Sequence, residues 1–542
     1  MQPTRSALIK TVRFAALFLL IGFVAVHHQS SKLLRLTPDI FAQSQQPSVN
    51  VVFDAYIKNN TPTSHSYSFG YPMAMSGDTL AVAQFNDLSI FRRTAQGTWQ
   101  KEAQITIPNP LHIYEFPSSI ALEGDRLLIG DPDYTLQQGD NDIFRAGTVY
   151  IYERDNNNSW QLQGQLFAPS SWAFGAFGFA LDLSGDTAIV SSMGTTEHPG
   201  AFTIFRRNQE GQWIQEFHKE APEANVMYAF DVAIDQDLIA ISNLQDGEFL
   251  GAPYFGHVLG HQHMTSQQKN SYVEVYRRSG STWQLESTLY SHMADSPTFD
   301  SFGYSLDIDN ETIVVGAPTD ENELFGVNPE ITSSVGTSPQ LGAAYIFEQA
   351  SPGDWSKITY LKANSYSPNA AFGHTVVIEG NKVLVGVSFH SNSNWNYQGA
   401  AHLFVKTADG WQDAMKIVAP NPDTRDYFGY MAVLSGEMIA ISAIHEASGA
   451  TGINGDQTDN SAPASGAVYT FVIEENSPPD EGKDPPNNGG TPPDTGENPP
   501  NEGENPPDEG ENPPDEGENP PDNGEQPVQD GDFKIDLPLI RH

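Results

Sequence analysis

One pattern recurs seven times along this 542-residue chain and constrains the fold more than any other feature. Each copy has an aromatic–small pair, then two alternating stretches around a two-residue polar turn, and a small residue six positions after the first turn residue. Because side chains alternate faces along a strand, constant spacing keeps one apolar face turned inward in every copy. Each copy therefore predicts a β-hairpin. The pairs begin at Phe69, Phe116, Phe177, Tyr228, Phe302, Phe372 and Phe428.

Two further strands are expected after each hairpin. The third opens with a small pair such as Gly147-Thr148 or Gly342-Ala343, and the fourth starts at a tryptophan after a short polar turn. Four strands per unit are typical of a propeller blade. The sequence therefore predicts an all-β, seven-bladed β-propeller of four-stranded blades. The tryptophans are Trp99, Trp160, Trp213, Trp283, Trp355 and Trp411.

The seventh unit lacks a tryptophan strand, because the chain runs from Phe471 into Pro-rich sequence. An alternating stretch from Val49 to Ile57 stands just before the first repeat. Pairing this stretch with the seventh blade would close the ring and remove open sheet edges. We therefore predict a propeller over residues 47–474, closed by its own N-terminal strand.

The fifth copy, from Phe302-Gly303 to Val315-Gly316-Ala317-Pro318, resembles the FG-GAP motif of integrin α-subunit propellers and their bacterial relatives. Only this copy carries a complete Gly-Ala-Pro. The resemblance implies a seven-bladed propeller, often extracellular, whose ligands meet one face of the ring. Many family members carry a calcium loop between the first two strands of certain blades. Here a two-residue turn replaces that loop in all seven copies, so no residue inherits that calcium role.

The two ends of the chain differ from the repeats. Residues 1–46 contain three basic residues before the apolar run Phe14–Val26, which has the pattern of an export signal and is shorter than the roughly 20 residues that span a bilayer. We expect a secreted or cell-surface protein that meets a membrane only through this segment, if it is not cleaved. Residues 475–527 form an acidic Pro/Glu/Asp/Asn/Gly-rich linker, expected to be disordered, and residues 528–542 a short C-terminal tail.

Composition argues against several functions. The net charge of −41, from 27 basic and 68 acidic residues, disfavours nucleic-acid binding, which needs Lys and Arg to replace counterions. Cysteine is absent, so disulfides, thiolate metal sites and cysteine nucleophiles are excluded. The chain has no nucleophile elbow, HExxH motif, P-loop or dinucleotide fingerprint. Paired carboxylates for glycoside hydrolysis stay open, since sequence does not give their separation.

Loop lengths predict which face of the ring is functional. Connections between strands one and two, and between three and four, are short, whereas several between two and three are long. Since strand direction alternates, the long loops and the segments between blades share one face. Binding usually resides in loops on a rigid scaffold, so we place the functional surface there. The long loops are 131–146, 243–271, 317–341, 387–398 and 443–465.

Two of these loops carry candidate metal ligands. His257, His261 and His263 are spaced so that they could ligate a transition metal, with exposed loop histidines as the alternative. Asp456 and Asp459 offer oxygen ligands for Ca²⁺, the one cofactor we consider, although the loop lacks an EF-hand frame. Asx turns without metal are the alternative there. No residue is assigned a catalytic role.

Two further loops hold candidates of other kinds. Asp320, Glu321 and Glu323, which follow shortly after the Gly-Ala-Pro, could also bind calcium. Trp395 and Tyr397 stand among Ser and Asn, where aromatic rings could bind a sugar or a partner protein, or could instead seat the loop on the ring.

The leading functional hypothesis is a non-enzymatic binding or adhesion module at the cell exterior. Its expected partner is an extracellular protein or a glycan, met through the long loops. One alternative is a polysaccharide-active hydrolase or lyase that uses acids of the same face. Another is a structural component of an envelope assembly.

Overall fold

The computed structural model of this chain describes residues 49–61, 69–84, 87–106, 118–139, 141–195, 197–222, 227–244, 271–291, 300–329, 340–365, 367–391 and 396–475. No helix occurs in this part, so none there is long and apolar enough to cross a membrane. The chain divides into two compact units, Met1–Pro478 and Pro479–His542, and every described residue belongs to the first. The predicted export signal and C-terminal tail lie outside the described residues.

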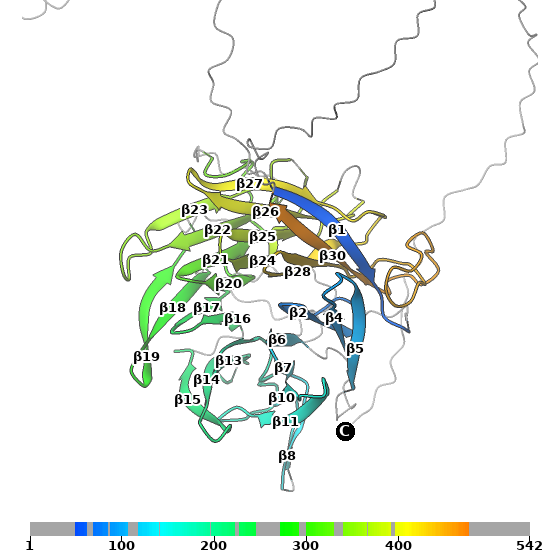
Figure 1. The fold of residues 1–542 in the computed structure, drawn as a ribbon. Helices are drawn as coiled ribbons and strands as arrows, with labels where there is room; N and C mark the ends of the chain where they lie inside the picture. The colour runs from blue at the N-terminus through cyan, green and yellow to red at the C-terminus, as the bar shows by residue number, and fades with distance from the viewer. Residues whose placement is uncertain are drawn as a thin grey trace, which may run out of the picture. The chain divides into compact units, whose positions relative to one another are not determined.

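Seven four-stranded antiparallel sheets make up the fold, which confirms the predicted all-β, seven-bladed propeller (Figure 1). The first strands of neighbouring blades contact one another in a closed cycle, so they form the inner wall of the ring. Blades 1 to 3 comprise β2 (Met73–Ser76), β3 (Thr79–Gln84), β4 (Asp87–Arg93) and β5 (Trp99–Thr106); β6 (Ser119–Glu123), β7 (Arg126–Asp131), β10 (Thr148–Arg154) and β11 (Trp160–Leu166); β12 (Leu181–Ser184), β13 (Thr187–Ser192), β14 (Ala201–Arg207) and β15 (Trp213–Glu220).

The remaining blades follow the same plan. A separate hairpin of β8 (Leu136–Gln138) and β9 (Asn141–Ile143) extends from the long loop of blade 2. Blades 4 to 7 comprise β16 (Tyr228–Asp235), β17 (Leu238–Asn243), β18 (Tyr272–Ser279) and β19 (Thr282–Leu289); β20 (Leu306–Asp309), β21 (Thr312–Ala317), β22 (Ala343–Glu348) and β23 (Lys357–Leu361); β24 (Phe372–Glu379), β25 (Lys382–Val387), β26 (Ala400–Thr407) and β27 (Gly410–Ile417); β28 (Phe428–Ser435), β29 (Met438–Ala443), β30 (Ala467–Glu475) and β1 (Val49–Ile57).

The ring closes as predicted. Strand β1 pairs antiparallel with β30, from Val49 opposite Glu475 to Ile57 opposite Val468. The Asp54 carboxylate of β1 also reaches blade 1, where it accepts a hydrogen bond from Trp99 Nε1 (2.7 Å) and pairs with Arg93 (3.0 Å). Backbone bonds thus tie the closing strand to blade 7, and side-chain bonds tie it to blade 1.

The repeated tryptophans have a structural role that goes beyond filling space. In two further blades the indole N–H donates to an acid on the fourth strand of the preceding blade: Trp160 to Glu102 (3.0 Å) and Trp355 to Glu286 (2.9 Å). Trp160 begins its strand as predicted, whereas β23 begins two residues after Trp355. Part of the acidity of the propeller therefore serves contacts between blades.

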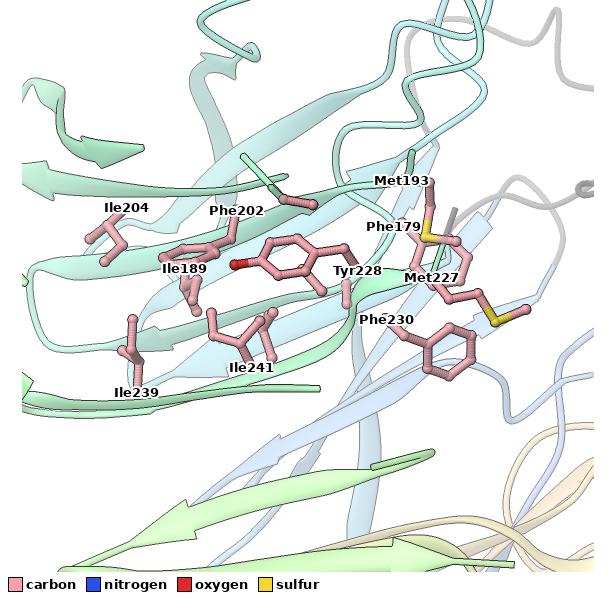
Figure 2. Close-up of a cluster of buried hydrophobic side chains, with 14 of the residues drawn as sticks. Phe179, Ile189, Met193, Phe202, Ile204, Met227, Tyr228, Phe230, Ile239 and Ile241 are labelled. Carbon is pink, nitrogen blue, oxygen red and sulfur yellow. The ribbon is translucent and has the colours of Figure 1, made fainter. Parts of the chain in front are cut away.

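The aromatic–small pair is explained by how closely neighbouring blades approach. A Cβ on Gly130 of blade 2 would lie 2.1 Å from the carbonyl oxygen of Gly178, the small member of the blade 3 pair. Phe177 beside it is fully buried. Figure 2 shows the neighbouring core between blades 3 and 4, where Phe179 and Phe230 lie beside Met193 and Met227. The recurring small residues thus permit backbone contact between blades, and the aromatic residues fill the core around them.

A cycle of hydrogen bonds joins the seven turns between first and second strands. In each blade the residue before the turn is Ser, Asp or Glu, and its side-chain oxygen accepts the first turn N–H of the next blade at 2.5 to 3.0 Å. The last bond runs from Gly77 N–H of blade 1 to Ser435 of blade 7, which completes the circle. The acceptors are Ser76, Glu123, Ser184, Asp235, Asp309, Glu379 and Ser435.

Candidate functional site

The long loops between strands two and three are held at their base by the same bonds in blades 2, 5, 6 and 7. One residue, which we call the anchor, donates its N–H to the carbonyl oxygen three residues earlier. Its own carbonyl oxygen accepts the N–H of the glycine before strand three, and all these bonds measure 2.9 to 3.3 Å. The loops therefore leave the ring from rigid, closed bases. The anchors are Tyr134, Asp320, His390 and Glu446.

The loop of blade 2 presents an exposed aromatic pair. Phe144 and Phe174 are 54% and 52% exposed, the most exposed Phe, Tyr or Trp side chains in the described part of the chain. Their ring centres lie 5.4 Å apart, edge to face. Phe144 lies near the end of the long loop of blade 2. Phe174 belongs to the segment that leads into blade 3, and its N–H donates to the Phe144 carbonyl oxygen (2.9 Å). The pair thus lies on the long-loop face, where two predicted functional segments meet.

The fold itself does not require these phenylalanines. At the junction of blades 6 and 7, Arg425 donates the same backbone bond to Asn396 (2.7 Å). Phe174, Arg425 and the corresponding Asn369 all have positive φ angles, of 63°, 69° and 55°. Backbone hydrogen bonds and dihedral angles therefore determine this turn, and its side chains differ between blades. Two exposed phenylalanines at one junction are a property of this site and not of the scaffold.

Arg145 follows Phe144 directly, and a second aromatic pair includes Trp172, two residues before Phe174. The Arg145 guanidinium lies 6.0 Å from the Phe174 ring centre and pairs with Asp133 (2.5 Å). The Trp172 ring stacks on His198 at 5.4 Å, and its buried Nε1 has no hydrogen-bond partner in the described part. We call Phe144, Phe174, Trp172 and His198 the aromatic patch. Exposed apolar surface with a polar rim is typical of an interaction site.

A family model for the FG-GAP repeat matches residues 283–347, which run from β19 of blade 4 to β22 of blade 5. This match and the seven four-stranded blades together fit an FG-GAP β-propeller. The match includes the Phe302-Gly303 copy, which resembles the FG-GAP motif in its sequence. The other six blades have the same four-stranded arrangement as this blade. No curated protein matches the chain.

The carboxylates of the predicted calcium loop accept hydrogen bonds within their own loop. Asp456 Oδ1 accepts both the N–H (2.9 Å) and the hydroxyl (2.7 Å) of Thr458. Asp459 accepts the same two groups of Ser461, at 3.0 and 2.9 Å. This arrangement is that of the Asx turns. No group of three or more His, Asp or Glu side chains that could hold a metal occurs in the described residues. Calcium binding there stays a prediction.

Asp320 is the anchor of blade 5 and is fully buried. It forms an ion pair with Lys362 (2.9 Å) and accepts the Tyr360 hydroxyl (3.0 Å). A small, mostly apolar pocket beside this pair is lined by Phe325, Lys362 and His390 among others. Its basic groups are already engaged, since Lys362 pairs with Asp320, and His390 contacts Lys416 at 2.6 Å. These groups serve the loop bases.

The predicted aromatic site of blade 6 is described in part. Tyr397 is half-buried, and its ring lies 5.9 Å from Phe389 and 6.2 Å from Tyr427. This is the geometry of the packing alternative, and a binding role for Tyr397 stays a prediction. Trp395 lies outside the described residues, as do His257, His261 and His263.

Sequence reasoning missed a collar of aromatic rings around the inner wall. The residue directly after the aromatic–small pair is aromatic in six blades, and neighbouring rings lie 4.6 to 5.6 Å apart. In blade 2 the position is Ser118, whose hydroxyl donates to the Phe179 carbonyl oxygen (3.2 Å). The signal was visible, because the position is fixed relative to each pair. The collar residues are Tyr71, Phe179, Phe230, Tyr304, His374 and Tyr430.

Proposed function

We propose that this FG-GAP propeller is a non-enzymatic binding module of the cell exterior whose long-loop face contacts a protein or a glycan. The exposed pair of Phe144 and Phe174 carries this proposal. It lies on the predicted face. Exposing two phenyl rings to water is unfavourable, and the scaffold does not require it. Exposed aromatic anchors within a polar rim are the usual centre of an interface.

The chemistry of the patch narrows the partner. Phenyl rings offer no hydrogen-bonding group, so they suit an apolar side chain or the C–H face of a sugar ring. Asp142, two residues before Phe144, and Glu197, next to His198, are exposed, and the chain carries a net charge of −41. Complementary charge therefore favours a partner surface that is neutral or basic.

The test compares the full chain with the double variant Phe144→Ser/Phe174→Ser on an array of polysaccharides and a set of purified surface proteins. We expect at least one ligand to bind and the variant to lose about tenfold or more in affinity, the usual loss at an interface hot spot. The matched control is Leu162→Ser/Leu285→Ser, which removes two exposed leucines from outer strands β11 and β19. Equal losses in both variants would contradict the patch. Cleaved polysaccharide would instead support the hydrolase or lyase alternative.

A further inference from the structure

The hairpin of β8 and β9 lies outside the seven blade sheets, and both of its edges are unpaired in the described part of the chain. It projects from blade 2 in Figure 1, and its residues Gln137, Gln138 and Asp142 are exposed. A two-stranded hairpin is at best marginally stable in water, and an unpaired strand edge is a template for pairing with another chain. The hairpin therefore offers backbone groups to which a further strand can bond.

The turn of the hairpin determines which backbone groups point outward. Its first residue, Gly139, has a φ of 65°, as the two-residue turns of β-hairpins require at this position. Gln138 and Asn141 flank this turn and exchange both backbone hydrogen bonds, so the next pair, Gln137 and Asp142, exchanges none. The N–H and C=O of Asp142 therefore point away from β8, and those of Gln137 point away from β9. Neither residue pairs with a further strand in the described ranges.

The outer edge of β9 leads into the aromatic patch. Residues 174–177 run beside residues 144–146 and bond to them through a row of backbone hydrogen bonds of 2.9 to 3.0 Å. This row starts at Phe144, whose carbonyl oxygen accepts the Phe174 N–H. Asp142, two residues earlier, directs its backbone groups to the same side, because these groups alternate along a strand. A strand that bonds to Asp142 would therefore continue the row and end beside the two phenylalanines.

The side chains near this edge favour a peptide of defined chemistry. Phe144 and Phe174 are about half exposed and suit an apolar side chain. Asp142 and Glu197 are exposed, whereas the base that follows Phe144, Arg145, is already held in an ion pair. Complementary charge therefore favours Lys or Arg beside the apolar residue. A glycan has no regular row of amide groups with which to continue the backbone bonds.

We propose that the long-loop face binds an extended peptide segment, which adds to β9 as a third strand at Asp142 and places an apolar side chain against Phe144 and Phe174. Backbone bonds to the strand edge supply affinity, and the rings and acids select the sequence, as in other cases of strand addition. The inference rests on the proposed binding function and narrows its partner from a protein or a glycan to a protein segment.

The test first selects binders from a phage-displayed library of random short peptides on the immobilised full chain. We expect the enriched peptides to combine apolar residues with Lys or Arg. The affinity of one synthetic binder is then measured for the full chain and for Asp142→Pro, Asp142→Ala and Gln137→Pro. Proline removes an N–H and is tolerated at a strand edge where that N–H points outward.

The three variants separate the backbone from the charge. Asp142→Ala removes only the carboxylate, so the additional loss in Asp142→Pro reports the N–H. We expect that additional loss to be about fivefold, the value of one hydrogen bond. Gln137→Pro alters the opposite edge of the hairpin and should leave the affinity unchanged. Equal affinities of Asp142→Pro and Asp142→Ala would overturn the proposal.

A second measurement leaves the protein unaltered and covers a proline variant whose hairpin is disturbed. The binder is synthesised in two forms, each with alternate backbone amides N-methylated, so that the two forms block opposite edges of the bound strand. We expect one form to lose about tenfold or more in affinity and the other to bind as the parent peptide does. Equal losses in both forms would contradict strand addition.

The outcomes also separate this inference from the proposed function. Binding of a glycan that depends on Phe144 and Phe174, with no peptide enriched, would refute strand addition and support the binding module. Peptide binding that Phe144→Ser/Phe174→Ser leaves unchanged would refute both the docking site and the role of the aromatic patch.

Discussion

Blades 2 and 5 hold their long loops with the same backbone bonds and opposite side-chain chemistry. In blade 2 the anchor Tyr134 lies against Phe167, with ring centres 6.0 Å apart. In blade 5 the anchor Asp320 pairs with Lys362, and both side chains are at most 1% exposed. Phe167 and Lys362 occupy the same position, directly after the fourth strand of their blades. The same backbone bonds at the loop base therefore occur with either an apolar or an ionic side-chain pair.

Blade 7 repeats the ionic version with residues that are far apart in the chain. Glu446 is the anchor, and Lys58, directly after the closing strand β1, pairs with it at 2.7 Å with both side chains 1% exposed. The Lys58 ammonium also donates to Ser465 (2.6 Å). Burying two charges costs desolvation, which close contact and added hydrogen bonds offset. In blade 7 the pair also joins the two ends of the ring.

The largest expected effect is the loss of one partner of this pair. Lys58→Met leaves the Glu446 carboxylate buried without its cation, which should lower the free energy of unfolding by about 3–5 kcal/mol. Denaturant unfolding measures the change. Lys382→Met is the control, since its partner Glu437 is 48% exposed, and it should cost less than about 1 kcal/mol. A loss in Lys58→Met no greater than in the control would show that the buried pair does not stabilise the closure.

Removing both charges of blade 5 tests whether the fold needs an ion pair there. Lys362→Met alone should cost nearly as much as Lys58→Met, whereas Asp320→Leu/Lys362→Met should regain at least half of that loss, because no buried charge is left unpaired. Recovery is incomplete, since the Tyr360 hydroxyl loses its acceptor. A double-mutant cycle measures the coupling. If the losses of unfolding free energy from the two substitutions simply add, the loop base of blade 5, unlike that of blade 2, depends on charged side chains.

The two ionic loop bases should respond differently to pH. In blade 7, burial and the charge of Glu446 raise the pKa of Asp426 to about 7. The folded state then holds a proton that the unfolded state has lost, so this contribution to stability falls as pH rises from 4 towards 7 and beyond. Asp426→Asn keeps the oxygen that accepts the Asp423 N–H, and it should regain about 2–3 kcal/mol more at pH 8 than at pH 5. Unfolding curves at both pH values measure this difference, and an equal gain at both would contradict it.

The parts of the fold that were predicted correctly follow from local spacing. The hairpin turns, the strand Val49–Ile57 and its pairing with blade 7 depend on alternation and on the count of tryptophans, which one sequence displays. The loop bases depend on contacts such as Lys58 with Glu446, 388 positions apart, and their chemistry changes between blades. A repeat search finds what is shared, and it passes over positions where each blade uses a different residue.

The missed site residues have a related cause. Phe144 and Phe174 lie in segments predicted to share the functional face, but the sequence does not single them out, because exposure depends on the direction in which a turn points a side chain. An alignment of the seven blade sequences with one another, in which the residues directly after the fourth strands are compared, would have revealed the anchors and their partners.

The smallest expected effect concerns the blade 7 loop beyond its base. Asp456→Ala removes an exposed Asx turn to Thr458 and should change the stability little, because both groups become solvated. Thermal unfolding with and without millimolar Ca²⁺ measures this and tests the calcium hypothesis at the same time. We expect the same midpoint of thermal unfolding with and without Ca²⁺, because the carboxylates of these turns already accept hydrogen bonds within the loop. A calcium-dependent rise that Asp456→Ala/Asp459→Ala abolishes would instead establish a metal site there, and would make the long loop of blade 7 functionally distinct from the loop of blade 2.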